Sequence, residues 1–100
     1  MRIKINGKTI FPQKTPYGEL AWSIVEAIDV LDYLQHNKHI ILGGDVLNKN
    51  FMHTYDSWFY DRNQNQSQEA NCDKSVLVAK EYIARYIQKN GDCYYVVFVY

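Results

Sequence analysis

The most informative absence in this sequence is an excess of charge of either sign. Its 100 residues include 11 Lys and Arg and 11 Asp and Glu, so the formal net charge is zero. A protein that binds nucleic acid generally carries a basic excess or a basic stripe, because contacts with phosphates supply most of its affinity. An amphipathic membrane anchor also needs a basic face. We therefore expect no nucleic-acid partner and no membrane partner.

A long hydrophobic segment is also missing. No apolar run approaches the roughly 18 residues that a transmembrane helix requires. Polar residues at Lys4, Asn6, Gly7 and Lys8 interrupt the N-terminal segment, which therefore lacks the apolar region of a signal peptide. We expect the protein to be cytoplasmic.

Cysteine is scarce. Cys72 and Cys93 are far apart in the sequence and form no CxxC pair. In a chain without an export signal, two such cysteines are expected to be reduced thiols. Cys93 begins an apolar segment and is expected to be buried, whereas Cys72 lies in a polar segment and is expected to be exposed.

Aromatic residues, in contrast, are abundant. Nine Tyr, two Trp and four Phe make up 15% of the chain, within an otherwise ordinary content of 47% hydrophobic and 22% charged residues. Tyr and Trp combine a large apolar body with a polar tip, which suits half-buried positions and interfaces. The length corresponds to one domain, residues 1–100.

The first part of the chain predicts a hairpin followed by a helix. Residues 2–11 predict a short hairpin, because Asn6-Gly7 tolerates the positive φ angles of a type I′ turn. Residues 16–38 predict a helix with Thr15 as its N-cap. Its apolar stripe, with spacings of three and four residues, consists of Leu20, Ile24, Ala27, Ile28, Leu31 and Leu34.

The middle of the chain predicts strands. Residues 39–42 form a short apolar run of the kind that is buried on both faces of a sheet. Gly43 and Gly44 are interpreted as the turn or bulge that ends this strand. Residues 46–53 predict a second hairpin. Residues 55–60 predict a further strand, bent at Asp56-Ser57.

The last part predicts a second helix and a central strand. Residues 61–75 are polar and predict a surface loop that leads into a helix, with Ser67 or Asp73 as its N-cap and Asn90-Gly91 as its end. The apolar stripe of this helix contains Val76, Ala79, Ile83 and Tyr86 or Ile87. Residues 93–100 are β-branched and aromatic, which is typical of a central strand. The order predicts an α+β fold, a small antiparallel β-sheet with two α-helices packed on one face.

Phosphate and metal sites are not supported by the motifs. A Walker-type phosphate loop needs GxxxxGK followed by Ser or Thr at the start of a helix. Here a strand follows the two glycines, and Asp45 would repel a phosphate. His36 and His39 are three residues apart, but no third ligand has a suitable spacing and HExxH is absent. We expect no metal and no cofactor.

Catalytic residues are not indicated either. There is no GxSxG, and neither cysteine has a neighbouring His in a known local motif. Asp29 and Asp32 share a helix face, which is usually just a solvated surface. Asp45 and Asp56 are expected to approach each other through the sheet, which leaves a small enzyme that uses these two carboxylates open as an alternative.

The aromatic segment YDSWFY, residues 55–60, is open to three interpretations. On a strand, Trp58 and Tyr60 share one face, and Tyr55 and Phe59 share the other. The first interpretation is that these aromatics are core and rim residues of the sheet, and the second is that they form a surface for a protein partner. The third is a platform on which RNA bases stack, but the sequence lacks the RNP motif and the basic surroundings of such a platform. For Trp58 we expect an indole partly buried under the edge of the sheet.

These segments together resemble a known family. A helix containing EAIDVLDYL leads into ILGGDVL, YDSW follows about ten residues later, and AKEYIARY and a closing YYVVFV come after a polar stretch. The series resembles the bacterial immunity protein 40 family of polymorphic toxin systems, over residues 20–100. The resemblance implies a cytoplasmic α+β protein without activity of its own, which binds and neutralises a cognate toxin C-terminal domain in contact-dependent inhibition or a related system. Such a toxin is often a nuclease.

The leading hypothesis is therefore a toxin-neutralising protein that is not an enzyme and that is a monomer or weak homodimer. Gly43 and Gly44 would form the structural turn that aims the following hairpin at the partner. The expected partner-binding residues are Asp45, Tyr55, Asp56, Trp58 and Tyr60. Two alternatives remain: the enzyme with Asp45 and Asp56, and a homodimerising scaffold that pairs its first or last strand across a symmetry axis.

Overall fold

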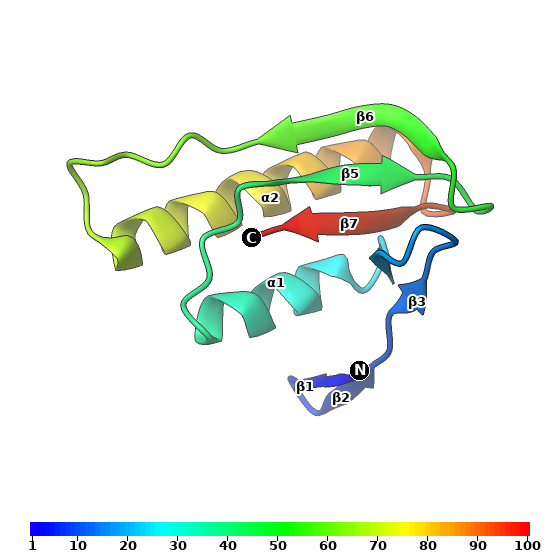
Figure 1. Cartoon of the computed structure of the whole chain (residues 1–100), viewed down its shortest axis with the longest axis horizontal. Coiled ribbons are helices and arrows are strands. Elements are labelled where there is room, and N and C mark those ends of the chain that lie inside the picture. Colours follow the sequence, from blue (N-terminus) through cyan, green and yellow to red (C-terminus); the bar gives the residue numbers. More distant parts are fainter.

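The structure is a computed structural model that describes all residues, 1–100 (Figure 1). The predicted α+β fold is confirmed, with two helices and antiparallel strands. The elements in chain order are β1 (Ile3–Ile5), β2 (Lys8–Ile10), β3 (Gln13–Lys14), β4 (Leu20–Ser23), α1 (Ala27–His36), β5 (Gly43–Leu47), β6 (His53–Phe59), α2 (Gln68–Asn90) and β7 (Tyr95–Val99).

The N-terminal hairpin is confirmed, but it forms a sheet of its own. β1 and β2 pair with Ile3 opposite Ile10. Asn6 has φ 53° and Gly7 has φ 75°, as a type I′ turn requires. Ile3 and Ile10 are buried in the main core, and the hairpin lies beside α1, away from the larger sheet (Figure 1). Burial of these two side chains stabilises a hairpin that is too short to persist alone.

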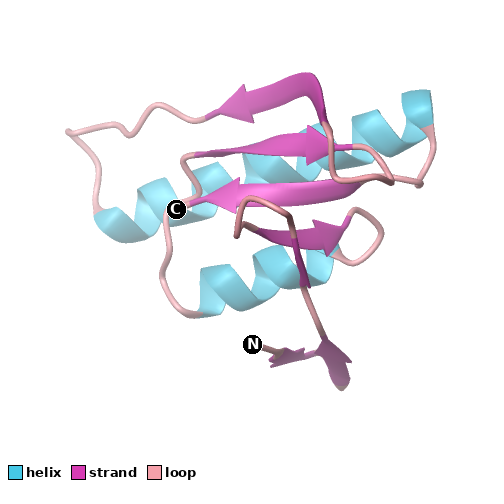
Figure 2. Ribbon diagram, turned by 45° about the vertical axis from the view of Figure 1, so that its right-hand side comes forward, coloured by secondary structure: helices cyan, strands magenta, loops and turns pink.

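The larger sheet has five strands in the order β3-β4-β7-β5-β6, and all neighbours are antiparallel (Figure 2). β7 lies in the middle, as its apolar sequence predicted. The two-residue β3 and the seven-residue β6 are the edge strands. Both helices cover one face of this sheet (Figures 1 and 2).

The predicted helix over residues 16–38 is wrong in its first half. Residues 20–23 form β4, in which Trp22 pairs with Val96 of β7. Thr15 is not a helix N-cap; its Oγ1 accepts hydrogen bonds from the N–H groups of Tyr17 and Glu19 and closes a tight turn before β4. Long-range pairing with β7 outweighs the local helical spacing, which is a weak preference in such a short segment.

The two helices that do form follow the predicted stripes. In α1 the buried residues include Ala27, Leu31 and Leu34. In α2 the Ser67 side chain accepts a hydrogen bond from the Ala70 N–H, which confirms it as the N-cap, and Gly91 with φ 89° ends the helix. Four predicted positions of α2 are buried: Val76, Ala79, Ile83 and Tyr86.

The predicted strand over residues 39–42 is wrong, because β5 begins only at Gly43. The Ile41 N–H donates to Ser75 Oγ of α2 at 2.8 Å instead of to a neighbouring strand. Ile41 is fully buried, whereas Leu42 is 43% exposed. Residues 39–41 are therefore a connection anchored to α2, and only Leu42 bonds to neighbouring strands, through its N–H to the Val99 carbonyl and its carbonyl to the Tyr60 N–H.

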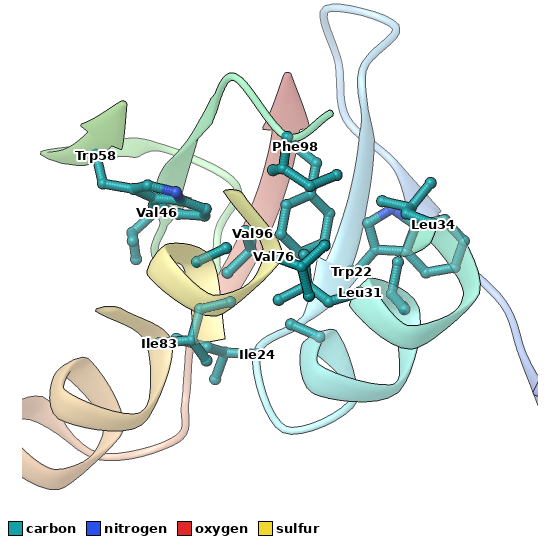
Figure 3. Packing of buried hydrophobic residues seen from close by; sticks show 14 of the residues in the cluster. Trp22, Ile24, Leu31, Leu34, Val46, Trp58, Val76, Ile83, Val96 and Phe98 are labelled. Carbon is teal, nitrogen blue, oxygen red and sulfur yellow. The ribbon is translucent and has the colours of Figure 1, made fainter. Parts of the chain in front are cut away.

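The main hydrophobic core fills the space between the sheet and the helices (Figure 3). Trp22, Val96 and Phe98 from the sheet meet Leu31 of α1 and Ile83 of α2 in this cluster. A second, smaller cluster on the opposite face contains Ala21, Leu47 and Val97, with Phe51 and Tyr95 packed against it. That face carries this small cluster but no covering helix, and we call it the open face.

Both cysteines are free thiols, but their predicted exposures are reversed. Cys72 is buried and Cys93 is exposed. Cys72 lies four residues before Val76 and so belongs to the buried stripe of α2, which extends into the polar stretch of the sequence. Burial raises the pKa of the Cys72 thiol.

Candidate functional site

The two glycines of the GGD segment lie inside β5 and do not form a turn, so that prediction is wrong. A Cβ atom on Gly44 would lie 2.3 Å from Cη2 of Trp58, and one on Gly43 would lie 2.3 Å from the Trp58 carbonyl oxygen. Neither glycine has a positive φ. Glycine is required here because Trp58 of the neighbouring strand approaches so closely, not because the chain bends.

Trp58 lies on the face of the sheet that the helices cover. Its side chain is only 8% exposed. The indole stacks on Tyr82 of α2 with centroids 4.9 Å apart and meets the edge of Phe98 at 6.1 Å (Figure 3 shows the Trp58 ring on the core side of the sheet). Its Nε1 has no hydrogen-bond partner. The expected partly buried indole is thus almost completely buried.

β6 contains a bulge that places Tyr55 in solvent. Between the pairs Asp45–Ser57 and Leu47–His53, the single residue Val46 faces the three residues 54–56 of β6. Tyr55 has φ 68° and is 93% exposed. Thr54 Oγ1 stabilises the bulge, because it donates to the Val46 carbonyl at 2.9 Å and accepts the Asp56 N–H at 3.1 Å. The predicted bend at Asp56-Ser57 is therefore centred one residue earlier.

Asp56 borders a groove between β6 and the C-terminal half of α2. Its Oδ2 accepts a hydrogen bond from the Tyr86 hydroxyl at 2.8 Å. Burial, together with this hydrogen bond, raises the pKa of Tyr86 to about 12. The residues that line the groove are Asp56, Tyr82, Arg85, Tyr86, Lys89 and Asn90.

Asp45 lies on the open face, where it pairs with Ser57 on one side and Val97 on the other. Because Asp56 reaches Tyr86 on the helical side, the two carboxylates lie on opposite faces of the sheet. The expectation that Asp45 and Asp56 approach each other is wrong, because Asp45 pairs with Ser57, whereas Asp56 shares the face of Trp58 two residues further along β6.

Tyr60 contacts a residue that no sequence motif had indicated. Its hydroxyl donates to Oδ1 of Asn71, which is fully buried at the start of α2. The same Oδ1 accepts the Asn63 N–H, and Nδ2 of Asn71 donates to the carbonyls of Asn63, Gln66 and Ser67. Asn71 thus holds the polar loop onto α2. In the sequence it is one polar residue among many.

Tyr82 and Tyr86 were also missed as neighbours of the aromatic segment. Their spacing of four residues places both on the α2 surface that faces β6, and their rings lie 6.0 Å apart. The predicted stripe of α2 already contained Tyr86, and extending it by one position from Ile83 would have indicated Tyr82.

Asp29 and Asp32 are not simply a solvated helix face. Asp29 accepts hydrogen bonds from Lys8 Nζ at 3.0 Å and from Asn6 Nδ2, and Asp32 binds Lys80 of α2. The hydrogen bond from Lys8 lowers the pKa of Asp29. These carboxylates tie α1 to the N-terminal hairpin and to α2.

Other kinds of site receive little support from the geometry. His36, His39 and His53 are exposed, and no three His, Cys, Asp or Glu side chains cluster in a way that would hold a metal ion. Neither α1 nor α2 combines the length and the hydropathy needed to cross a bilayer.

Comparison with known proteins gives one match. A family model described as Immunity protein 40 matches residues 13–100. No curated protein and no solved structure matches the chain. The matched residues contain the whole five-stranded sheet and both helices, whereas the N-terminal hairpin precedes them.

Proposed function

This chain belongs to the immunity protein 40 family, and from that premise we propose that it binds and neutralises a cognate bacterial toxin domain. The observation that carries the proposal is the extent of the match, which covers all elements of the main fold. An immunity role requires a binding surface and no chemistry of its own.

The finer proposal concerns the toxin. We infer that it is the C-terminal domain of a polymorphic toxin, delivered by contact-dependent growth inhibition or a related system, and that it is a nuclease met in the cytoplasm. The zero net charge favours recognition through aromatic and hydrogen-bonded contacts over mimicry of nucleic acid by charge.

We propose that the five expected partner-binding residues divide into two roles. Tyr55, Asp45 and Asp56 have side chains that a partner is able to reach. Trp58 and Tyr60 are held by Tyr82 and Asn71, respectively, and contribute by fixing β6. Tyr and Trp are frequent at energetically important interface positions.

The alternatives are weaker. An enzyme with paired carboxylates lacks support because Asp45 and Asp56 lie on opposite faces of the sheet. A homodimer that pairs the last strand is excluded, since β7 already has a neighbour on each side. No contact of the first hairpin favours a dimer through that element.

Co-expression tests the proposed function. Cells that produce the toxin domain encoded immediately upstream should grow only when this protein is also produced, and the two purified proteins should form a tight one-to-one complex. An unrelated toxin serves as the control and should not be neutralised. Growth arrest by the upstream toxin despite abundant folded protein would show that the proposal is wrong.

A further inference from the structure

The free edge of β6 is the most accessible stretch of unpaired backbone in the sheet. β6 is the outermost strand, and no other element lies beyond it (Figure 1). Exposed edges in natural proteins are usually short or carry Lys or Pro, which prevents unwanted pairing. β6 is seven residues long and contains neither residue. The bulge at Tyr55 interrupts it, but residues 57–59 remain regular.

The direction of the peptide groups along β6 follows from one hydrogen bond. The Tyr60 N–H donates to the Leu42 carbonyl at 2.8 Å. Along an antiparallel strand, successive residues point their N–H and C=O groups alternately toward and away from the neighbour. Trp58 therefore points its peptide groups toward β5, and Ser57 and Phe59 point theirs outward. No loop contact or side chain provides these outward groups with a hydrogen bond.

The two sides of this edge differ in chemistry. On the open face, Phe59 is 75% exposed. On the helical side lies the groove that Tyr82, Arg85 and Lys89 line. Arg85 already pairs with Glu81 at 3.8 Å, and the Asp56 carboxylate accepts the Tyr86 hydroxyl, whereas Lys89 has no carboxylate within 4.0 Å. Lys89 is therefore the cation of the groove that is free to bind an acidic side chain of a partner.

We propose that the toxin domain adds an extended strand to the free edge of β6, with an apolar side chain against Phe59 and a carboxylate in the groove beside Lys89. Side chains of an added strand alternate between the two faces, so one segment satisfies both requirements. This inference rests on the proposed function, because the occupant is the toxin.

A second copy of the chain is a less suitable occupant. Two β6 strands that pair antiparallel about a two-fold axis form a continuous sheet with all helices on the same face. A second copy would bring the same groove, with its own unpaired Lys89, to the same face of the joined sheet, and so offers a cation where the groove needs a carboxylate.

Hydrogen exchange tests the inference without any substitution. In the free protein, the amide protons of Ser57 and Phe59 should exchange rapidly, whereas those of Trp58 and Tyr60 should be protected. In the complex with the upstream-encoded toxin domain, the amides of Ser57 and Phe59 should slow by at least about tenfold because they gain hydrogen bonds. If the complex forms and these two amides are unchanged, the strand-addition proposal is wrong.

Substitutions give a second test. Ser57→Pro removes the outward N–H and leaves the pairing with β5 intact, as proline allows on an edge strand. It should weaken toxin binding by about tenfold or more, whereas the control Ser57→Ala, which keeps the N–H, should bind within about twofold of wild type. Lys89→Glu should weaken binding more than Lys74→Glu, because Lys74 is an exposed lysine of α2 that does not line the groove.

The outcomes separate the two proposals. If the wild-type protein fails to bind the toxin, the proposed function is wrong. If the wild type binds and the Ser57→Pro and Ser57→Ala variants bind equally well, the function stands and the edge is not the docking site. If two copies of the chain associate and their contact protects Ser57 and Phe59 in the absence of toxin, the occupant is a second copy and our assignment is overturned.

Discussion

At the scale of single residues, the contact between Gly44 and Trp58 controls the local geometry of the sheet. The benzene part of the indole covers the Gly44 Cα so closely that three of its atoms would lie within 2.9 Å of an added Cβ. The ring is fixed on its other sides by Tyr82 and Phe98. It therefore has little room to move, and a side chain on Gly44 must displace either the ring or β5.

Gly44→Ala is expected to destabilise the protein by about 3 kcal/mol, because overpacking forces the ring or the strand to shift. In a Trp58→Phe background, where the benzene part of the indole is missing, the same substitution should cost less than about 1 kcal/mol. Urea unfolding of the four proteins provides the free energies. Additive effects of the two substitutions would contradict the proposed clash.

Trp58→Ala is expected to destabilise by about 3 kcal/mol or more, since the ring is 8% exposed and packs against two other aromatic rings. Ser57→Ala, at the neighbouring exposed position, should change stability by no more than about 0.5 kcal/mol. Chemical denaturation provides both values. A Trp58→Ala protein of full stability would contradict the observed packing.

Tyr86 should make stability depend on pH in the alkaline range. Its pKa of about 12 in the folded state exceeds the usual value of 10. Between these values the unfolded chain loses the phenolic proton while the folded protein keeps it, so stability falls as pH rises from 10 toward 12. The fall should be roughly 1–3 kcal/mol. Thermal or urea unfolding of wild type and Tyr86→Phe checks this, because the variant should lose that part of the pH dependence.

At the scale of elements, the buried Asn71 side chain determines how the loop between β6 and α2 is held. Five hydrogen bonds to Asn71 connect it to Tyr60, Asn63, Gln66 and Ser67. Removing a buried hub leaves several polar groups unsatisfied, which costs more than the loss of one exposed hydrogen bond.

Asn71→Ala should destabilise the protein by about 3 kcal/mol and make residues 61–67 more sensitive to protease. Gln64→Ala, in the same loop but with an exposed side chain and no hydrogen bond, is the matched control and should behave like wild type. Limited proteolysis followed by mass spectrometry locates the cleavage sites. Equal cleavage in both variants would show that Asn71 does not anchor the loop.

Elements whose signals are local could be predicted from the sequence. The Asn6-Gly7 turn, the Ser67 cap and the Gly91 stop each depend on the conformation of a few adjacent residues, and all three are confirmed. β4 could not be predicted, because Trp22 and Ser23 pair with residues of β7 more than 70 positions away, and its other neighbour, β3, is only two residues long. The strand start at Gly43 likewise depends on the distant Ser75, which binds the Ile41 N–H.

The candidate site was less predictable than the fold. The alternation of β6 correctly placed Trp58 on one face and Tyr55 on the other. The same alternation places Asp56 with Trp58, on the face opposite Asp45, which the expected approach of the two carboxylates did not take into account. No sequence pattern revealed the bulge opposite Val46. The partners of Tyr60 and Asp56 lie on α2, so these contacts depend on tertiary packing.

At the scale of the whole molecule, the N-terminal hairpin is an integral part of the core although it precedes the family match. Deletion of residues 1–12 should destabilise the protein by about 3 kcal/mol or more, because the burial of Ile3 and Ile10 is lost. Lys8→Ala, which removes only an ion pair at the surface, should cost less than about 1 kcal/mol. Calorimetry compares the two. If the deletion is no more harmful than Lys8→Ala, the hairpin is only an accessory.

The central position of β7 has a consequence for the time at which the protein becomes protective. A ribosome makes β7 after all the other elements, yet β7 is the strand that joins β4 to β5. Before it emerges, the five-stranded sheet exists only as two separate strand pairs, β3-β4 and β5-β6, which form no continuous surface on which the helices can pack. An incompletely synthesised copy therefore cannot present β6 in its final position. Protection should start only when synthesis of the domain is finished, so stalled or truncated copies would not shield the cell.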